Sequence, residues 1–225
     1  MTIRPKTRKT FAVGVELGQS SDGSAIAVVE LVDRPGSPTA PPAGQPDFHL
    51  RYLKRFPPAP DHTATARGLL GLLDFIERTE SKEKNPFGGR DLDVDLTVLL
   101  VIDQTVAHKP VVDMILKMVN RSEARRVIIV GSHSESYSDG YYRVPKPELI
   151  SLMQAGLELK QLKFAKDLPE TNRLAEELIQ YQDRPTNPMP LEHSWREHPS
   201  DDLVLAVALA CWTLQQGPGF SYEYI

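Results

Sequence analysis

Three apolar segments of this 225-residue chain border on acidic side chains that could ligate metal ions. Two of them read as β-strands that end in an acid, Glu16 and Asp103. In the third, Asp201 and Asp202 come directly before the apolar run 203–212, which predicts a buried helix. Carboxylates are hard oxygen ligands, and acids that converge from separate elements can hold the paired divalent ions that cleave phosphodiesters. The alternative is that all of them are ordinary solvated acids at the ends of elements.

Length and composition indicate one globular domain, because 225 residues allow a single sizeable core and 40% of them are hydrophobic. The formal net charge of −4 argues against a protein that coats nucleic acid over its whole surface, but it allows a local basic groove. No apolar run is long enough to cross a membrane, and no signal-type segment follows the basic start. Cys211, the one cysteine, lies inside the apolar helix, so we expect no intrachain disulfide and a cytoplasmic protein.

The hydrophobic patterns predict a mixed α/β fold. Alternation and turn residues indicate an antiparallel meander of three strands, and runs that are apolar on both faces are typical of central parallel strands. The predicted strands span residues 11–16, 25–32, 48–56, 96–102 and 127–130. Helices are expected at 63–80, from Pro110, from Pro147, after a capping box of Asp167 with Glu170, and after Asp202. Polar loops are expected at 82–90, 132–140 and 182–199.

The order of these elements, β-β-β-α-β-α-β followed by further helices, is that of the ribonuclease H-like fold. In this fold an antiparallel meander joins a set of parallel strands, and helices cover both faces of the sheet. We expect one such domain at residues 10–216 with a Pro-rich loop insertion at 34–46, a basic N-terminal tail at 1–9 and a C-terminal tail at 217–225.

From about residue 10 to 215 the chain resembles the nuclease domain of phage terminase large subunits, and more broadly the ribonuclease H-like nucleases that include Holliday-junction resolvases. The residues that carry the resemblance are 14–19 with 25–30, 101–105 with 110–113, 142–146 and 200–206. Glu16 stands where the family pattern has aspartate, and the glycines usual after the second acid are missing beyond Asp103. His198 is separated from the acid pair by two residues, which makes Ser200 the expected N-cap of the last helix.

The resemblance implies a DNA endonuclease with two Mg²⁺ or Mn²⁺ ions held by Glu16, Asp103 and Asp202. Asp201 would be a further acid of the catalytic group. Terminases also package DNA with an ATPase, but the sequence contains no phosphate-loop motif, so a separate packaging ATPase is the implied partner.

Four basic side chains are candidates for contacts with DNA phosphates, although each of them is also explained as an ordinary surface residue. They are Lys146, Arg143, His108 and Lys109.

Two other functions are compatible with the same sequence. One is a catalytically degraded ribonuclease H-like domain that binds DNA or a packaging partner, which the glutamate at position 16 and the negative net charge favour. The other is a carbohydrate- or nucleotide-handling member of the wider superfamily, which the lack of a second glycine-rich phosphate loop disfavours.

Overall fold

The computed structural model describes residues 7–18, 23–33, 45–57, 61–83, 92–105, 107, 109–121, 124–131, 134–182 and 201–217. The strands are β1 (Thr7–Glu16), β2 (Ala25–Val32), β3 (Asp47–Arg55), β4 (Lys82–Glu83), β5 (Leu92–Asp103), β6 (Arg125–Val130), β7 (Ser136–Ser138), β8 (Tyr141–Pro145) and β9 (Leu162–Phe164). The helices are α1 (His62–Glu80), α2 (Lys109–Val119), α3 (Lys146–Glu158), α4 (Thr171–Gln182) and α5 (Asp202–Gln216).

Within these residues the strands form one mixed sheet in the order β7-β8-β6-β5-β1-β2-β3-β9, and β4 pairs with β5 beside this path. β1, β2 and β3 form an antiparallel meander. β1, β5, β6 and β8 run parallel to one another. This combination of a meander with parallel strands confirms the ribonuclease H-like fold predicted from the sequence.

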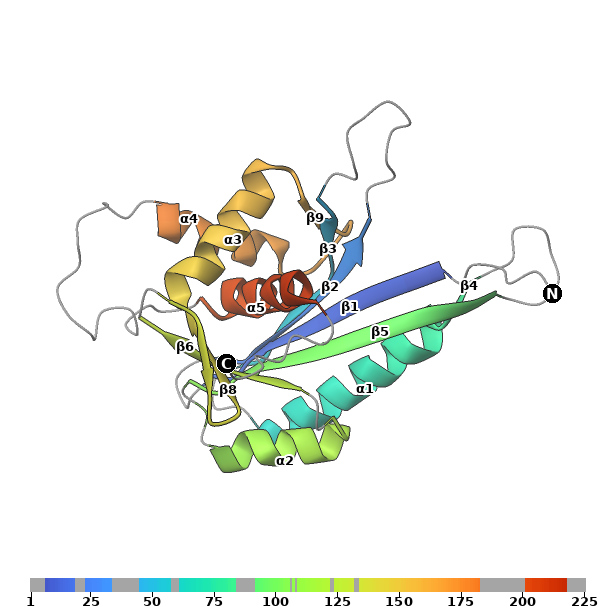
Figure 1. Ribbon diagram of the computed structural model, residues 1–225, viewed down its shortest axis with the longest axis horizontal. Coiled ribbons are helices and arrows are strands. Elements are labelled where there is room, and N and C mark those ends of the chain that lie inside the picture. The colour runs from blue at the N-terminus through green and yellow to red at the C-terminus, as the bar shows by residue number, and fades with distance from the viewer. Residues whose placement is uncertain are drawn as a thin grey trace.

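Helices cover both faces of the sheet, with α1 and α2 on one side and α3, α4 and α5 on the other (Figure 1). Side chains of β1 point alternately to the two faces of the sheet, so successive residues pack against different helices. Phe11, Val13 and Val15 pack into a core with residues of α1 and α2, whereas Ala12 belongs to the core around α5. β1 is therefore covered on both faces, as its alternating large and small apolar residues require.

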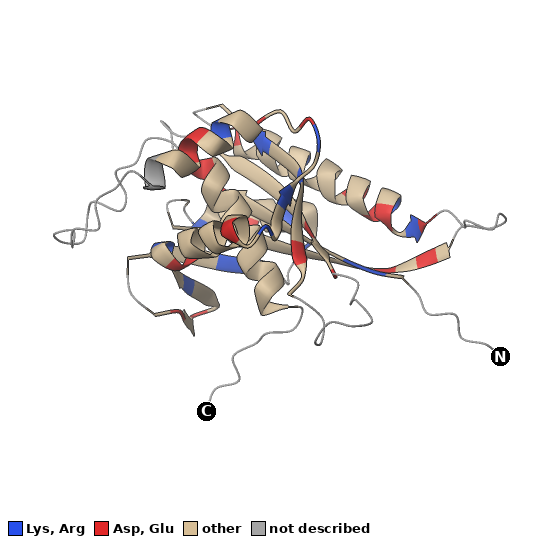
Figure 2. Ribbon diagram, turned by 90° about the horizontal axis from the view of Figure 1, so that it is seen from above, with Lys and Arg blue, Asp and Glu red and all other residues tan. Residues whose placement is uncertain are grey.

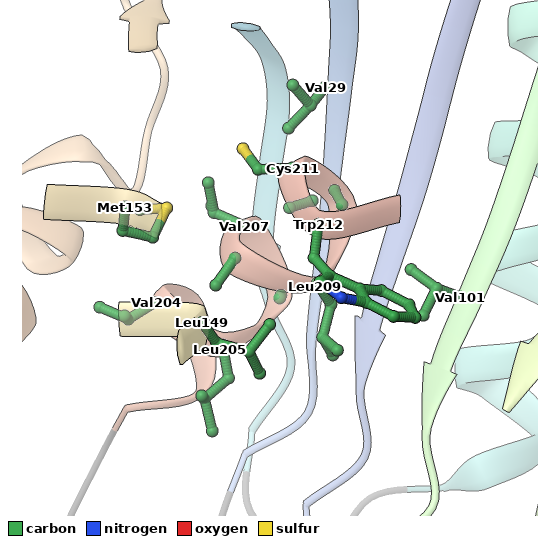
Figure 3. Close-up of a cluster of buried hydrophobic side chains, with 14 of the residues drawn as sticks. Val29, Val101, Leu149, Met153, Val204, Leu205, Val207, Leu209, Cys211 and Trp212 are labelled. Carbon is green, nitrogen blue, oxygen red and sulfur yellow. The ribbon is translucent and has the colours of Figure 1, made fainter. Parts of the chain in front are cut away.

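Helix α5 is buried along almost its whole length, from Asp202 to Leu214. Figure 3 shows its side chains, Cys211 among them, beside Val29 of β2, Val101 of β5 and Met153 of α3. A helix that is apolar all round belongs in the centre of a domain, as the sequence predicted. Of the helices described, none combines the length and the hydropathy that a bilayer-spanning segment needs.

Helix α5 approaches the sheet very closely at Gly14 in β1. A Cβ atom at this position would lie 2.1 Å from the backbone oxygen of Ala206 and 3.0 Å from the backbone nitrogen of Ala210. Backbone atoms cannot move aside as a flexible side chain can, so only glycine allows α5 to approach β1 this closely.

The C-terminal end of α5 is held by Arg125, the first residue of β6. Its Nη1 donates to the backbone oxygen of Thr213 at 2.8 Å, and its Nη2 donates to the backbone oxygen of Gly217. The guanidinium also lies over the rings of Tyr142 and Trp212, 6.0 and 5.9 Å from their centroids. Arg125 thus satisfies carbonyl groups that the helix end leaves without partners.

Several predictions about single elements were wrong. The loop expected at 132–140 contains β7, which pairs with the unpredicted β8 in a hairpin, and the short strands β4 and β9 were also missed. Asp167 and Glu170 do not form the predicted capping box. Asp167 has a left-handed φ of 61°, and α4 begins only at Thr171, whose hydroxyl donates to the backbone oxygen of Leu168. A local turn therefore replaces the expected cap.

We predict that Gly14→Ala lowers the free energy of unfolding by about 3 kcal/mol or more, because the new methyl group would overlap the backbone of α5. The matched control is Gly71→Ala in the exposed part of α1, where nothing lies within 4 Å of the added Cβ. That change should raise the free energy of unfolding by up to about 1 kcal/mol, since alanine is the better helix former. Urea titrations followed by circular dichroism measure both values, and similar results for the two variants would contradict the close packing of α5 on β1.

Candidate metal centre at the carboxyl edge of the sheet

Three parallel strands, β1, β3 and β5, end in charged residues at one edge of the sheet. These are Glu16, Arg55 and Asp103. Ala25 of β2 pairs with both Glu16 and Arg55, so the three residues form one row across the meander. The parallel register of β1 with β5 brings Asp103 beside Glu16. Side chains in such a row project from the same face of the sheet, which here is the face that α5 covers.

Glu16 and Asp103 form a buried carboxyl pair, with 8% and 2% of their surfaces exposed. Burial, with the nearby charge of Asp103, raises the pKa of Glu16 well above its ordinary value. Burial also raises the pKa of Asp103, but hydrogen bonds from Glu16 and Thr105 oppose this shift. Burial and the neighbouring carboxylate thus both disfavour the charged form of Glu16.

Thr105 fixes the orientation of Asp103. Its backbone N–H donates to Asp103 Oδ1 at 2.9 Å, and its hydroxyl donates to the same oxygen. The Thr105 hydroxyl in turn accepts a hydrogen bond from the backbone N–H of Ile129 in β6 at 2.6 Å. The acid at the end of β5 is thereby tied to the neighbouring strand.

Asp201 and Asp202 bring two further acids to this edge from the start of α5. The carboxylate of Asp202 faces the guanidinium of Arg55, with Oδ2 2.5 Å from Nε and Oδ1 3.2 Å from Nη2. Asp201 Oδ2 lies 2.5 Å from Nζ of Lys146. Both acids contribute to the field that raises the pKa of Glu16, so the four carboxyl groups share one neighbourhood. Asp201 also occupies the N-cap position of α5, so the prediction of Ser200 as the N-cap was wrong.

The N-terminus of α5 is capped by a side chain from another helix. Asp201 makes no capping bond with its own side chain. Instead Glu177 of α4 accepts hydrogen bonds from the backbone N–H groups of Leu203 and Val204, both at 3.1 Å, on its Oε2. Because Glu177 satisfies these two donors, the carboxylates of Asp201 and Asp202 make their contacts at the edge of the sheet instead.

The predicted phosphate-binding residues lie in different places. Lys146 is the first residue of α3, follows directly after β8, and is held in the site by Asp201. Arg143 contacts Ser138 and Asp139 in the β7–β8 hairpin. Lys109 is an exposed residue at the start of α2, and His108 lies outside the described residues.

The four acids suit a divalent cation chemically, because they are hard oxygen donors and the buried Oε2 of Glu16 has no hydrogen-bond partner within the described chain. In the present arrangement, however, no three Asp, Glu, His or Cys side chains of the described segments converge on a single cation position. In this arrangement Arg55 lies against Asp202 and Lys146 lies against Asp201. Elsewhere on the described ribbon, acidic and basic residues are interspersed (Figure 2).

Sequence reasoning missed Arg55, Glu177 and Thr105 as parts of this site. The sequence could have indicated Arg55, because it ends the third strand of a meander whose first strand ends in Glu16. Thr105 stands two residues after Asp103, a spacing that allows a hydroxyl to bond back to the acid. Glu177 carried no local signal, since its partners lie 26 and 27 residues away in the chain.

Solved structures of nucleases align with most of the chain. The human cytomegalovirus terminase nuclease domain, soaked with manganese, is 15% identical with a TM-score of 0.47 over 89% of this chain and 81% of that chain. The large terminase nuclease from the thermophilic phage G20c is 16% identical with a TM-score of 0.43 over 90% and 81%. Thermus thermophilus RuvC is 10% identical with a TM-score of 0.36 over 89% and 91%. No protein-family model and no curated protein matches the sequence.

We predict that the Glu177 carboxyl makes folding stability fall as the pH rises from about 4.5 to about 7. Burial raises the pKa of Glu177 from 4.5 to about 7, so the folded protein retains a proton that the unfolded chain loses in this range. The loss is at most about 3 kcal/mol for a shift of this size. Glu177→Gln keeps an oxygen that accepts the two backbone bonds but removes the charge, so its stability should vary less with pH.

Denaturant unfolding at a series of pH values measures this effect. Glu177→Ala is the control, because it removes both the cap and the titrating group. Its stability should also vary less with pH and should lie about 0.5–2 kcal/mol below that of Glu177→Gln. If Glu177→Gln keeps the pH dependence of the wild type, another group is responsible for it.

Proposed function

We propose that this chain is a metal-dependent DNA endonuclease that hydrolyses phosphodiester bonds with Mg²⁺ or Mn²⁺. The observation that carries the proposal is that three separate elements bring acids to one edge of the sheet. Glu16 comes from β1, Asp103 from β5, and Asp201 with Asp202 from the start of α5. Buried acids gathered in this way are costly to folding, and a cation site is the function that such an arrangement serves best.

In this proposal Glu16, Asp103 and Asp202 would hold two divalent ions, which when bound supply an activated water and stabilise the leaving oxygen. The protein supplies the rest of the chemistry. Thr105 holds Asp103 in one orientation, and Glu177 holds the start of α5 in place. Lys146 and Arg55 bring positive charge to the same edge, where they would face the phosphate groups of DNA.

A binding protein with a degraded site is the alternative function, and the same contacts give it support. Asp201 and Asp202 each face a basic side chain, and burial raises the pKa of Glu16, so the negative charge of the acids is largely compensated in the present arrangement. Such a protein would bind DNA or a packaging partner without cutting. On either proposal a separate packaging ATPase is a candidate partner.

We predict that Asp103→Asn abolishes Mn²⁺-dependent nicking of plasmid DNA while the fold is retained, because an amide keeps the shape of the side chain but not its charge. The control is Asp95→Asn, which lies on the same strand with 59% of its side chain exposed and pairs only loosely with Arg8 at 3.6 Å. Loss of this solvent-exposed pair changes stability little, so the control should nick like the wild type. A wild type that neither nicks DNA nor binds Mg²⁺ or Mn²⁺ in calorimetry would rule out the endonuclease and favour the binding protein.

We also predict that Glu16→Asp lowers both nicking and Mn²⁺ affinity. The backbone at the end of β1 is fixed by its pairing with β2 and β5 and by the contact of Gly14 with α5. The strand therefore cannot shift to compensate for a side chain that is shorter by one methylene. The carboxylate of Asp at position 16 would lie farther from Asp103. Increased nicking would show that the family's aspartate is the better ligand here, and unchanged nicking with unchanged affinity would remove Glu16 from the site.

A further inference from the structure

We propose that the guanidinium of Arg55 compensates the charge of Asp202 in the absence of a metal ion. When DNA binds, the guanidinium would move from Asp202 to a DNA phosphate. The binding of a cation at Asp202 and the binding of DNA would then be coupled through one side chain. This inference rests on the proposed endonuclease function and adds to it the order in which the site is filled.

The first argument is the geometry of the pair. Arg55 meets Asp202 with two nitrogens, Nε at 2.5 Å from Oδ2 and Nη2 at 3.2 Å from Oδ1. The side chains are 15% and 7% exposed, so the pair is largely removed from water. This contact places positive charge against both oxygens of Asp202, so a cation that binds there must compete with the guanidinium.

The second argument is that a glycine, Gly23, lies directly beside the ion pair of Arg55 and Asp202. A Cβ at Gly23 would lie 2.8 Å from Arg55 Nε and 3.2 Å from Asp202 Oδ2. It would also lie 2.5 Å from the backbone oxygen of Phe56. Gly23 precedes β2 at the same edge of the sheet, so the absence of a side chain there keeps a space in which the guanidinium can lie against the acid.

The third argument is that a buried ion pair adds little net stability, because the cost of removing both charges from water offsets their attraction. Apolar side chains of β3 and α5 already pack together in one core cluster. A function other than stability therefore accounts best for a guanidinium placed on an acid of the candidate metal centre.

The fourth argument concerns the identity of the ligand that would release Arg55. Two divalent cations would balance the charges of Glu16, Asp103, Asp201 and Asp202, and would leave Arg55 and Lys146 with surplus positive charge. A phosphodiester group is an anion, and the guanidinium fork fits its oxygens as well as it fits a carboxylate. Exchange of Asp202 for a DNA phosphate therefore conserves the hydrogen bonding of Arg55 while it frees the acid.

The same contacts predict an order of binding. Among the described contacts, no ion pair joins Glu16 or Asp103 to a basic side chain, so a cation that enters between them displaces no guanidinium or ammonium group. A cation at Asp202 must compete with Arg55. Without DNA the first cation should thus bind more tightly than the second, and DNA should strengthen the second.

The test is Mn²⁺ binding, followed by the electron paramagnetic resonance signal of free Mn²⁺ and by calorimetry, with no cleavage required. Arg55→Gln removes the charge, so without DNA it should strengthen the weaker Mn²⁺ site by about tenfold or more, as expected from the loss of a unit charge in direct contact. Arg51→Gln is the matched control, because Arg51 lies on the same strand, is half exposed, and pairs with Glu30 at 3.4 Å. It should bind Mn²⁺ like the wild type.

The second measurement repeats the titration with a short DNA duplex that carries phosphorothioate linkages, which slow cleavage. DNA should strengthen the weaker Mn²⁺ site of the wild type, and this gain should be largely lost in Arg55→Gln. If Arg55→Gln does not fold, Arg55→Lys provides the test, because it keeps the charge but not the fork. It should match the wild type without DNA and show a smaller gain with DNA.

Unchanged or weaker Mn²⁺ binding in Arg55→Gln without DNA would overturn the proposal and leave Arg55 as a residue that only positions Asp202. If the wild type still nicks DNA with Mn²⁺ in that case, the endonuclease function stands by itself. If the wild type binds no Mn²⁺ and does not nick DNA, both the function and this inference are wrong.

Discussion

The close approach of α5 to β1 at Gly14 is the contact on which the rest of the structure depends. A glycine is needed because the backbone of Ala206 lies where any side chain would begin. Ala206 is one helical turn beyond Asp202, so the same contact sets how far the acids at the start of α5 lie from Glu16 at the end of β1. Packing in the core thus fixes the spacing of the charged groups at its edge.

The two ends of α5 are held by side chains from elsewhere, which separates the stability of the helix from the chemistry at its start. Glu177 accepts from the first backbone N–H groups and Arg125 donates to the last carbonyl groups. An N-cap aspartate commonly uses its own carboxylate for this purpose. Here Asp201 bonds to Lys146 instead, so both acids of the pair face the edge of the sheet.

Local patterns in the sequence predicted the parts of this fold that have a strong period or a long apolar run. The alternation in β1, the apolar strand β5 and the buried helix α5 all formed where expected, and Glu16 and Asp103 follow directly from the parallel pairing of their strands. β7 was missed because it has only three residues, two of them serines, and lies at the edge of the sheet. Arg55 and Glu177 were missed because their partners lie 147 and 26 residues away, and only the folded chain reveals such contacts.

The arrangement also explains how a site with four acids can exist in a stable domain. Apolar clusters on both faces of the sheet supply the stability, and ion pairs such as Asp202 with Arg55 are close to neutral in that balance. Charged partners at the edge can therefore be exchanged without unfolding the core beneath them. On the proposed function, Arg55 and Lys146 would exchange the acids for phosphate while metal cations take their place, and each exchange would replace one compensated charge with another. The rigid backbone under Glu16, Asp103 and Asp202 would stay in place while their partners change.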